Sequence, residues 1–93
     1  MALPAGARFP LGRIVVTEGA SWTVDAREIR ESLSRHVSGD WGDCELEDCQ
    51  RNERALEDGA RVFSVYRTTR DQVYWVITEA DRSVTTVLLS SEY

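Results

Sequence analysis

Apolar residues change their spacing once along the chain, which divides it into a helical part and a strand part. In the first part three apolar residues recur every four positions, the spacing of one helix face: Ile29, Leu33 and Val37. We therefore predict a helix over residues 24–37, with Thr23 or Asp25 as its N-cap. Before it, residues 1–12 are expected to be an extended lead-in. Residues 13–17 are expected to form a short strand that "EGAS" at 18–21 interrupts.

A second helix is predicted over residues 45–58, with Asp43 as N-cap and Gly59 just beyond its end. Its apolar face is weak, so it is expected to lie on the surface with one edge packed. From Arg61 onward the apolar residues alternate, which predicts strands over 61–67, 73–78 and 84–89.

Short polar loops join these three strands, and such loops favour antiparallel neighbours. The predicted fold class is α+β: a short N-terminal strand, two helices, then a three-stranded antiparallel β-meander. With 93 residues, the chain is expected to be a single domain over 1–93.

The strand register follows from placing the more apolar side chains inward. Pairing Phe63 with Ile77, and Ile77 with Val87, gives one consistent apolar face. Its members are Phe63, Val65, Trp75, Ile77, Val87 and Leu89. We expect Trp75 and Ile77 to pack against the first helix. The opposite face would then show Ser64, Tyr66, Tyr74, Val76, Thr78, Thr86 and Leu88.

The last hairpin, "VITEADRSVTTVLL" at 76–89, carries more polar residues than a turn needs. In the register above, Arg82 and the hydroxyls of Thr78 and Thr86 share one exposed surface with Ser64 and Tyr66. Glu79, Asp81 and Ser83 lie at its end. A guanidinium among hydroxyls suits a phosphate or a carboxylate. Arg82→Ala is then expected to abolish binding and to change stability by less than about 1 kcal/mol. The alternative is an ordinary solvated sheet face.

Composition and charge favour some classes of binding partner over others. The net charge is −5 and the pI about 4.8, which disfavours a broad grip on nucleic acid or on an anionic membrane. Seven carboxylates gather in residues 42–59, an acidic surface that a basic protein would match. We see neither a signal peptide nor 18 consecutive apolar residues, so a cytoplasmic location without membrane contact is expected.

His36 is the only histidine, with Asp40 placed to orient its ring and Trp41 to form an apolar wall. A lone histidine near a helix end is more often a surface residue than a catalyst. Cys44 and Cys49 lack the spacing and the further soft ligands of a metal site, so neither a metal nor a cofactor is expected.

The chain resembles a family of small bacterial proteins encoded by plasmids and integrated mobile elements. The resemblance lies in "FPLGRIVVT" (9–17), "RHVSGDWG" (35–42), Asn52, "GARVFSVY" (59–66) and "WVITEADRSVTTVLLSSEY" (75–93). Some members carry a restriction–modification label, but this chain is too short for a methyltransferase or motor subunit. The resemblance supplies no roles. It implies a shared pattern that includes His36, Asp40, Trp41, Asn52, Arg61, Ser64, Tyr66, Thr78, Glu79, Asp81, Arg82, Ser83, Thr85 and Thr86.

A looser architectural similarity, helices followed by an antiparallel meander, is to barnase-like and RelE-like ribonucleases. Two functions follow as hypotheses. The first is an accessory protein of mobile elements that acts on a protein partner, such as a nucleic-acid enzyme, through the polar sheet face and the acidic helix. The second is a metal-independent ribonuclease with His36 and Glu79 as acid and base and Arg61 or Arg82 stabilising the phosphorane. The ribonuclease requires His36 and Glu79 within about 8 Å across an open cleft.

Overall fold

The computed structural model of the chain describes residues 6–93, so the first five residues of the expected lead-in lie outside it. In chain order the elements are β1 (Arg13–Val16), α1 (Glu18–Thr23), α2 (Ala26–Val37), α3 (Leu46–Asp58), β2 (Val62–Arg67), β3 (Val73–Thr78), β4 (Val84–Leu89) and a 3₁₀ turn, η1 (Ser90–Glu92). The predicted α+β class is confirmed.

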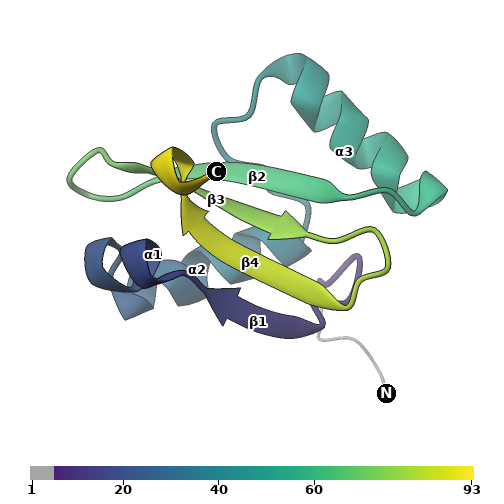
Figure 1. Cartoon of the computed structure of the whole chain (residues 1–93). Helices are drawn as coiled ribbons and strands as arrows, with labels where there is room; N and C mark the ends of the chain where they lie inside the picture. The colour runs from purple at the N-terminus through teal and green to yellow at the C-terminus, as the bar shows by residue number, and fades with distance from the viewer. Residues whose placement is uncertain (1–5) are drawn as a thin grey trace.

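The four strands form one mixed sheet in the order β1-β4-β3-β2. β2, β3 and β4 are successive antiparallel neighbours, whereas β1 lies parallel to β4, so the sheet is not the purely antiparallel meander that was predicted. Helices α1 and α2 lie behind the sheet in Figure 1, and α3 runs beside β2. The opposite face of the sheet, toward the viewer, carries no α-helix of the described chain.

Helix α1 occupies the segment where the sequence predicted only a break. The Thr17 side chain caps it by accepting a hydrogen bond from the Ala20 backbone N–H at 3.2 Å. Glu92, near the other end of the chain, accepts from the Thr17 hydroxyl at 2.6 Å and from the Gly19 N–H at 3.2 Å. Because Ala20 is fully buried, this short helix closes one end of the core.

The two longer helices lie close to their predicted bounds. Helix α2 begins one residue after Asp25, which makes no side-chain cap hydrogen bond. Helix α3 is preceded by Glu45, and not by Asp43 as predicted. Gly59 ends α3 in the left-handed conformation, with φ 75°. The Asp43 N–H is instead used by the sheet, because it donates to the Val65 carbonyl at 2.7 Å.

The predicted register holds between β2 and β3 and is off by one residue between β3 and β4. Phe63 pairs with Ile77 as expected, but Ile77 pairs with Thr86 and not with Val87. The turn accounts for the shift. The Glu79 N–H donates to the Val84 carbonyl at 3.0 Å, which leaves four residues in the turn, and Arg82 adopts a left-handed φ of 61°.

The sheet face that packs on α1 and α2 is therefore not the one expected for β2 and β3. We call it the covered face. It presents Val62, Ser64, Tyr66, Tyr74, Val76, Thr78, Thr85, Val87 and Leu89. The other, the open face, presents Val15, Phe63, Val65, Trp75, Ile77, Thr86 and Leu88. Trp75 is thus only partly buried and does not belong to the core cluster against which Ile29 and Leu33 pack.

The outer edge of β2 is closed by polar contacts. The Asn52 side chain of α3 donates to the Phe63 carbonyl at 2.6 Å and accepts from the Phe63 N–H at 3.0 Å. The Val65 N–H donates to the Trp41 carbonyl at 3.0 Å. These bonds satisfy backbone groups that an edge strand otherwise leaves open, and they hold α3 against the sheet.

Candidate functional site

The predicted site residues His36, Ser64 and Thr78 do come together, but inside the protein. The His36 side chain is fully buried between α2 and the covered face. Its Nδ1 lies 2.6 Å from the Ser64 Oγ, and its Nε2 lies 2.9 Å from the Thr78 Oγ1. The edges of Phe9 and Trp41 complete its surroundings. This arrangement is a satisfied polar network within the core and not a surface for a ligand.

The direction of the hydrogen bonds fixes the histidine tautomer. The Thr85 hydroxyl donates to the Leu11 carbonyl at 2.6 Å, since a carbonyl only accepts. Each hydroxyl has one proton, so Thr78 must donate to Thr85, 2.7 Å away. Thr78 can then only accept from His36, which places the ring proton on Nε2. Nδ1 is left as the acceptor for Ser64.

The same surroundings keep His36 neutral. Burial, with a smaller contribution from the Arg82 charge, lowers the pKa of His36 from 6.5 to about 3. A second proton on Nδ1 would also face Ser64, which already uses its own proton there. A buried neutral imidazole with both nitrogens occupied has no free lone pair or N–H for a substrate.

Arg82 is a structural anchor in this geometry. Its guanidinium donates to the carbonyls of Ala60 at 2.6 Å, Glu79 at 3.1 Å and Ala55 at 3.1 Å. It also lies over the Phe9 ring, 5.5 Å from the ring centroid. The contacts to Ala55 and Ala60 join the hairpin to the carbonyl end of α3, where a cation is favourable. The surface of hydroxyls around Arg82 that the sequence predicted does not exist.

Arg82→Ala is expected to lower the free energy of unfolding by about 2–3 kcal/mol, because three carbonyls lose a charged donor. This loss is larger than the change of less than about 1 kcal/mol that the sequence predicts for an exposed Arg82. Urea unfolding measures the loss. Arg82→Lys should recover only part of it, since an ammonium lacks the fork that reaches several carbonyls.

Arg30→Ala is the matched control, because Arg30 is exposed on α2 and takes part in no hydrogen bond or ion pair of the described residues. It should change stability by less than about 0.5 kcal/mol. An Arg82→Ala protein as stable as this control would show that the contacts to α3 contribute nothing.

The remaining predicted site residues are scattered. Tyr66 is buried and donates to the Asp40 carbonyl at 2.6 Å, and burial raises the pKa of its phenol. The Asp40 carboxylate pairs with Arg35 at 2.8 Å, which lowers its pKa. Trp41 is buried and donates from Nε1 to Glu53 at 2.9 Å.

Four others lie on the outside. Asp81 accepts from Ser83 within the turn, Glu79 is exposed beside it, and Thr86 and Arg61 lie toward the open face. His36 is buried whereas Glu79 is exposed, so the two do not face each other across an open cleft. The condition set for a ribonuclease site is not met.

An aromatic cluster on the open face is the feature that sequence reasoning missed. Trp75 lies between Phe63 and Tyr93, with ring centroids 5.1 Å and 5.0 Å away, and both contacts are edge to face. Cross-strand neighbours shield Ile77 and Leu88, which are 4% and 8% exposed without a helix over them. The period-two pattern contains this face, but the pattern predicts that the face packs inward against the first helix.

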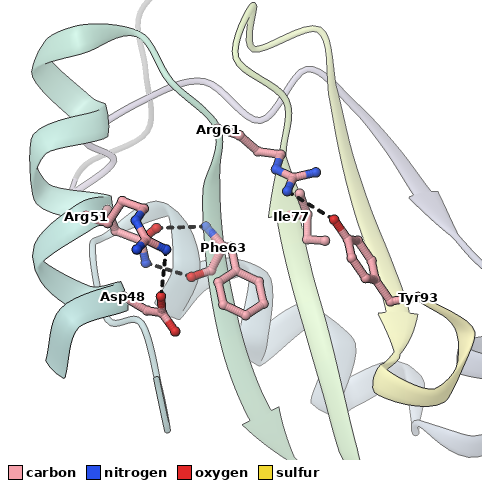
Figure 2. Close-up of a pocket in the computed structure, with 7 residues that line it drawn as sticks. Asp48, Arg51, Arg61, Phe63, Ile77 and Tyr93 are labelled. Atoms are coloured by element: carbon pink, nitrogen blue, oxygen red, sulfur yellow. Dashed lines mark hydrogen bonds and ion pairs between the residues drawn. The ribbon is translucent and has the colours of Figure 1, made fainter. Parts of the chain in front are cut away.

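A pocket of about 210 Å³ adjoins this cluster on the side of α3. Figure 2 shows Phe63 and Ile77 on the strands, Asp48 and Arg51 on α3, and Arg61 pointing toward Tyr93. Arg51 pairs with Asp48 at 2.9 Å, and Arg61 donates to the Tyr93 hydroxyl at 3.1 Å. The pocket therefore combines an apolar floor with two guanidinium groups.

Cys44 and Cys49 are free, half-buried thiols. Burial, with the neighbouring Cys49, raises the pKa of Cys44 to about 12, so it is a protonated thiol at neutral pH. Within residues 6–93 no three side chains among His, Cys, Asp and Glu gather as metal ligands would. In the same range, no helix is long and apolar enough to cross a membrane.

No protein-family model matches the chain, and no curated protein or solved structure matches it either.

Proposed function

We propose that this chain is a non-catalytic accessory protein that binds a protein partner through the open face of its sheet. The observation that carries the proposal is the aromatic cluster of Phe63, Trp75 and Tyr93 on a face that no α-helix of residues 6–93 covers. Tyrosine, tryptophan and phenylalanine are enriched at protein interfaces, and tryptophan and tyrosine are frequent among the few residues that carry most of the binding energy. Tyr93 is 66% exposed and Phe63 and Trp75 are partly exposed, so the cluster presents apolar surface to solvent, as interaction sites do.

The charges around the face agree with a protein partner. All eleven basic residues of the chain are arginine, the cation that protein interfaces favour over lysine. Arg13 lies on the open face through its pairing with Val84, and Arg61 lines the pocket beside it. Neither forms an ion pair with a described residue, which leaves both for acidic groups of a partner.

A protein is favoured over nucleic acid because the whole molecule carries a charge of −5, which repels a polyanion at long range. The acidic helix α3 borders the same face and belongs to the proposed contact surface. The hydroxyl row does not, because Ser64 and Thr78 are buried. The family resemblance indicates where to search first, among proteins encoded by the same plasmid or integrated element.

Trp75→Gln tests the proposal. Because Trp75 is partly buried on an uncovered face, the substitution is expected to lower stability by only about 1 kcal/mol and to weaken partner binding at least tenfold, as for an interface hot spot. Quantitative affinity capture from the host would compare proteins recovered by wild type and variant. Calorimetry with the purified partner would then measure the affinity.

Trp22→Gln is the matched control, since Trp22 is 82% exposed on α1, away from the open face. It should recover the same partner as wild type. Loss of the partner with Trp22→Gln and retention with Trp75→Gln would place the interface elsewhere. A wild-type dimer that Trp75→Gln dissociates would make the occupant of the face a second copy of the chain.

A further inference from the structure

We infer that the pocket between α3 and Tyr93 receives a carboxylate carried next to an apolar side chain, so that the partner segment bound there has one acidic residue beside an apolar one. This inference rests on the proposed function and specifies the chemistry of the partner. It depends on the pocket's position, since the pocket opens beside the aromatic cluster and shares Phe63 and Tyr93 with it.

The floor of the pocket is apolar. Phe63 and Ile77 are cross-strand partners on the open face, and both line the pocket. Asn52 needs no hydrogen-bond partner from a ligand, because its side-chain amide already bonds the backbone N–H and carbonyl of Phe63. An apolar side chain of a partner therefore meets a surface that water solvates poorly.

The rim of the pocket is positive. Two guanidiniums, those of Arg51 and Arg61, stand against the single carboxylate of Asp48. Asp48 is paired with Arg51 at 2.9 Å, which leaves the charge of Arg61 without a carboxylate among the described residues. The Tyr93 hydroxyl, 3.1 Å from Arg61, holds that guanidinium at the mouth. A guanidinium with free N–H groups binds a carboxylate in a bidentate way.

The size of the pocket favours a side chain over a free cofactor or nucleotide. Its volume of about 210 Å³ is below the range of about 300–1,000 Å³ typical of small-molecule sites. A volume of this order matches one side chain of a partner protein. The rest of that partner would be held by contacts to the open face. A single-stranded nucleic acid, with a base on the aromatic cluster and a phosphate at Arg61, is the competing occupant.

A titration of the ¹⁵N-labelled full chain with 3-phenylpropionate, followed by NMR, tests the inference. We expect saturable shifts at the amides of Phe63, Ile77 and Tyr93 and at the Trp75 indole. The uncharged 3-phenylpropanol and the variant Arg61→Gln should each bind about tenfold more weakly. Arg30→Gln, which removes an exposed guanidinium on α2 away from the pocket, should match wild type.

Three results overturn the inference: no saturable shift at the pocket, equal affinity for the acid and the alcohol, or unchanged binding by Arg61→Gln. Tighter binding of adenosine monophosphate, in competition with 3-phenylpropionate, would assign the pocket to nucleic acid.

The two experiments distinguish an error in the ligand chemistry of the pocket from an error in the proposed docking face. If Trp75→Gln loses the partner while the pocket ignores carboxylates, only the ligand chemistry is wrong. If the pocket binds the probe but no partner depends on Trp75, the docking face is wrong.

Discussion

His36→Ala should lower the free energy of unfolding by about 3–5 kcal/mol, which is most of the stability of a marginal domain of this size. The loss has two physical sources. Ser64 and Thr78 are fully buried and would lose the imidazole that bonds them, at about 1–3 kcal/mol for each unsatisfied group. Phe9 and Trp41 would also border a cavity where the ring had been.

Urea unfolding followed by tryptophan fluorescence measures this loss. Glu79→Gln serves as the control, because Glu79 is the exposed partner in the ribonuclease hypothesis and its carboxylate forms no hydrogen bond or ion pair with residues 6–93. It should change stability by less than about 0.5 kcal/mol. If His36→Ala were as mild as Glu79→Gln, the buried network would not stabilise the fold, and a functional role for the histidine would return.

The network also shows why the sequence predicted the elements better than the site. Periodicity depends on local geometry, so the strands and the two longer helices fell within a few residues of their observed bounds. Which face of a strand is buried is a tertiary property. Ser64 and Thr78 look like solvent-facing residues until a histidine from α2 supplies their partner. Nothing in the spacing of residues 61–89 reveals that partner.

The register error comes from the last turn, whose conformation depends on contacts that are distant in the sequence. Four residues fit the last turn because Arg82 takes a positive φ, which is rare for arginine. It is held there by carbonyls of α3 and of the segment after it, distant in sequence. The α1 helix, by contrast, had a readable signal. Thr17 is an N-cap residue, and Glu18 directly after it places an acidic side chain in the first turn of the helix.

The candidate docking face is the sheet face that the sequence predicts to be buried. The aromatic and apolar residues Phe63, Trp75 and Ile77 were identified as a set, and their pairing across β2 and β3 was correct. They were assigned to the core because apolar residues are usually inside. The protein instead buries hydroxyls that satisfy one another and leaves aromatic side chains partly exposed. Buried polar networks and partly exposed aromatic clusters are both uncommon in average proteins, so this pair of features points to a functional role for the open face.

Acid should destabilise the protein through His36 before its carboxylates contribute. The pKa of His36 is about 3 in the folded state and about 6.5 in the unfolded chain, so between these values only the unfolded state binds the proton. Its contribution is complete above about pH 6.5 and is lost as the pH falls toward 3. Each unit in this window should remove about 1.4 kcal/mol. Hydrogen bonds lower the pKa values of Asp40, Glu53, Asp81 and Glu92, whose contributions therefore disappear only in more acidic solution.

Urea midpoints measured from pH 7 to pH 5 isolate the histidine, because few carboxylates titrate there. Wild type should lose about 2 kcal/mol between pH 7 and pH 5, because the unfolded chain takes up a proton at His36 in this range and the folded protein does not. His36→Gln keeps one donor and one acceptor for Ser64 and Thr78 but gains no proton, so its stability should be nearly flat with pH. If that variant does not fold, the ring resonances of wild-type His36 give the same answer. A ring that titrates near pH 6 in the folded protein would mean that the imidazole is accessible to water, and the buried network would have to be abandoned.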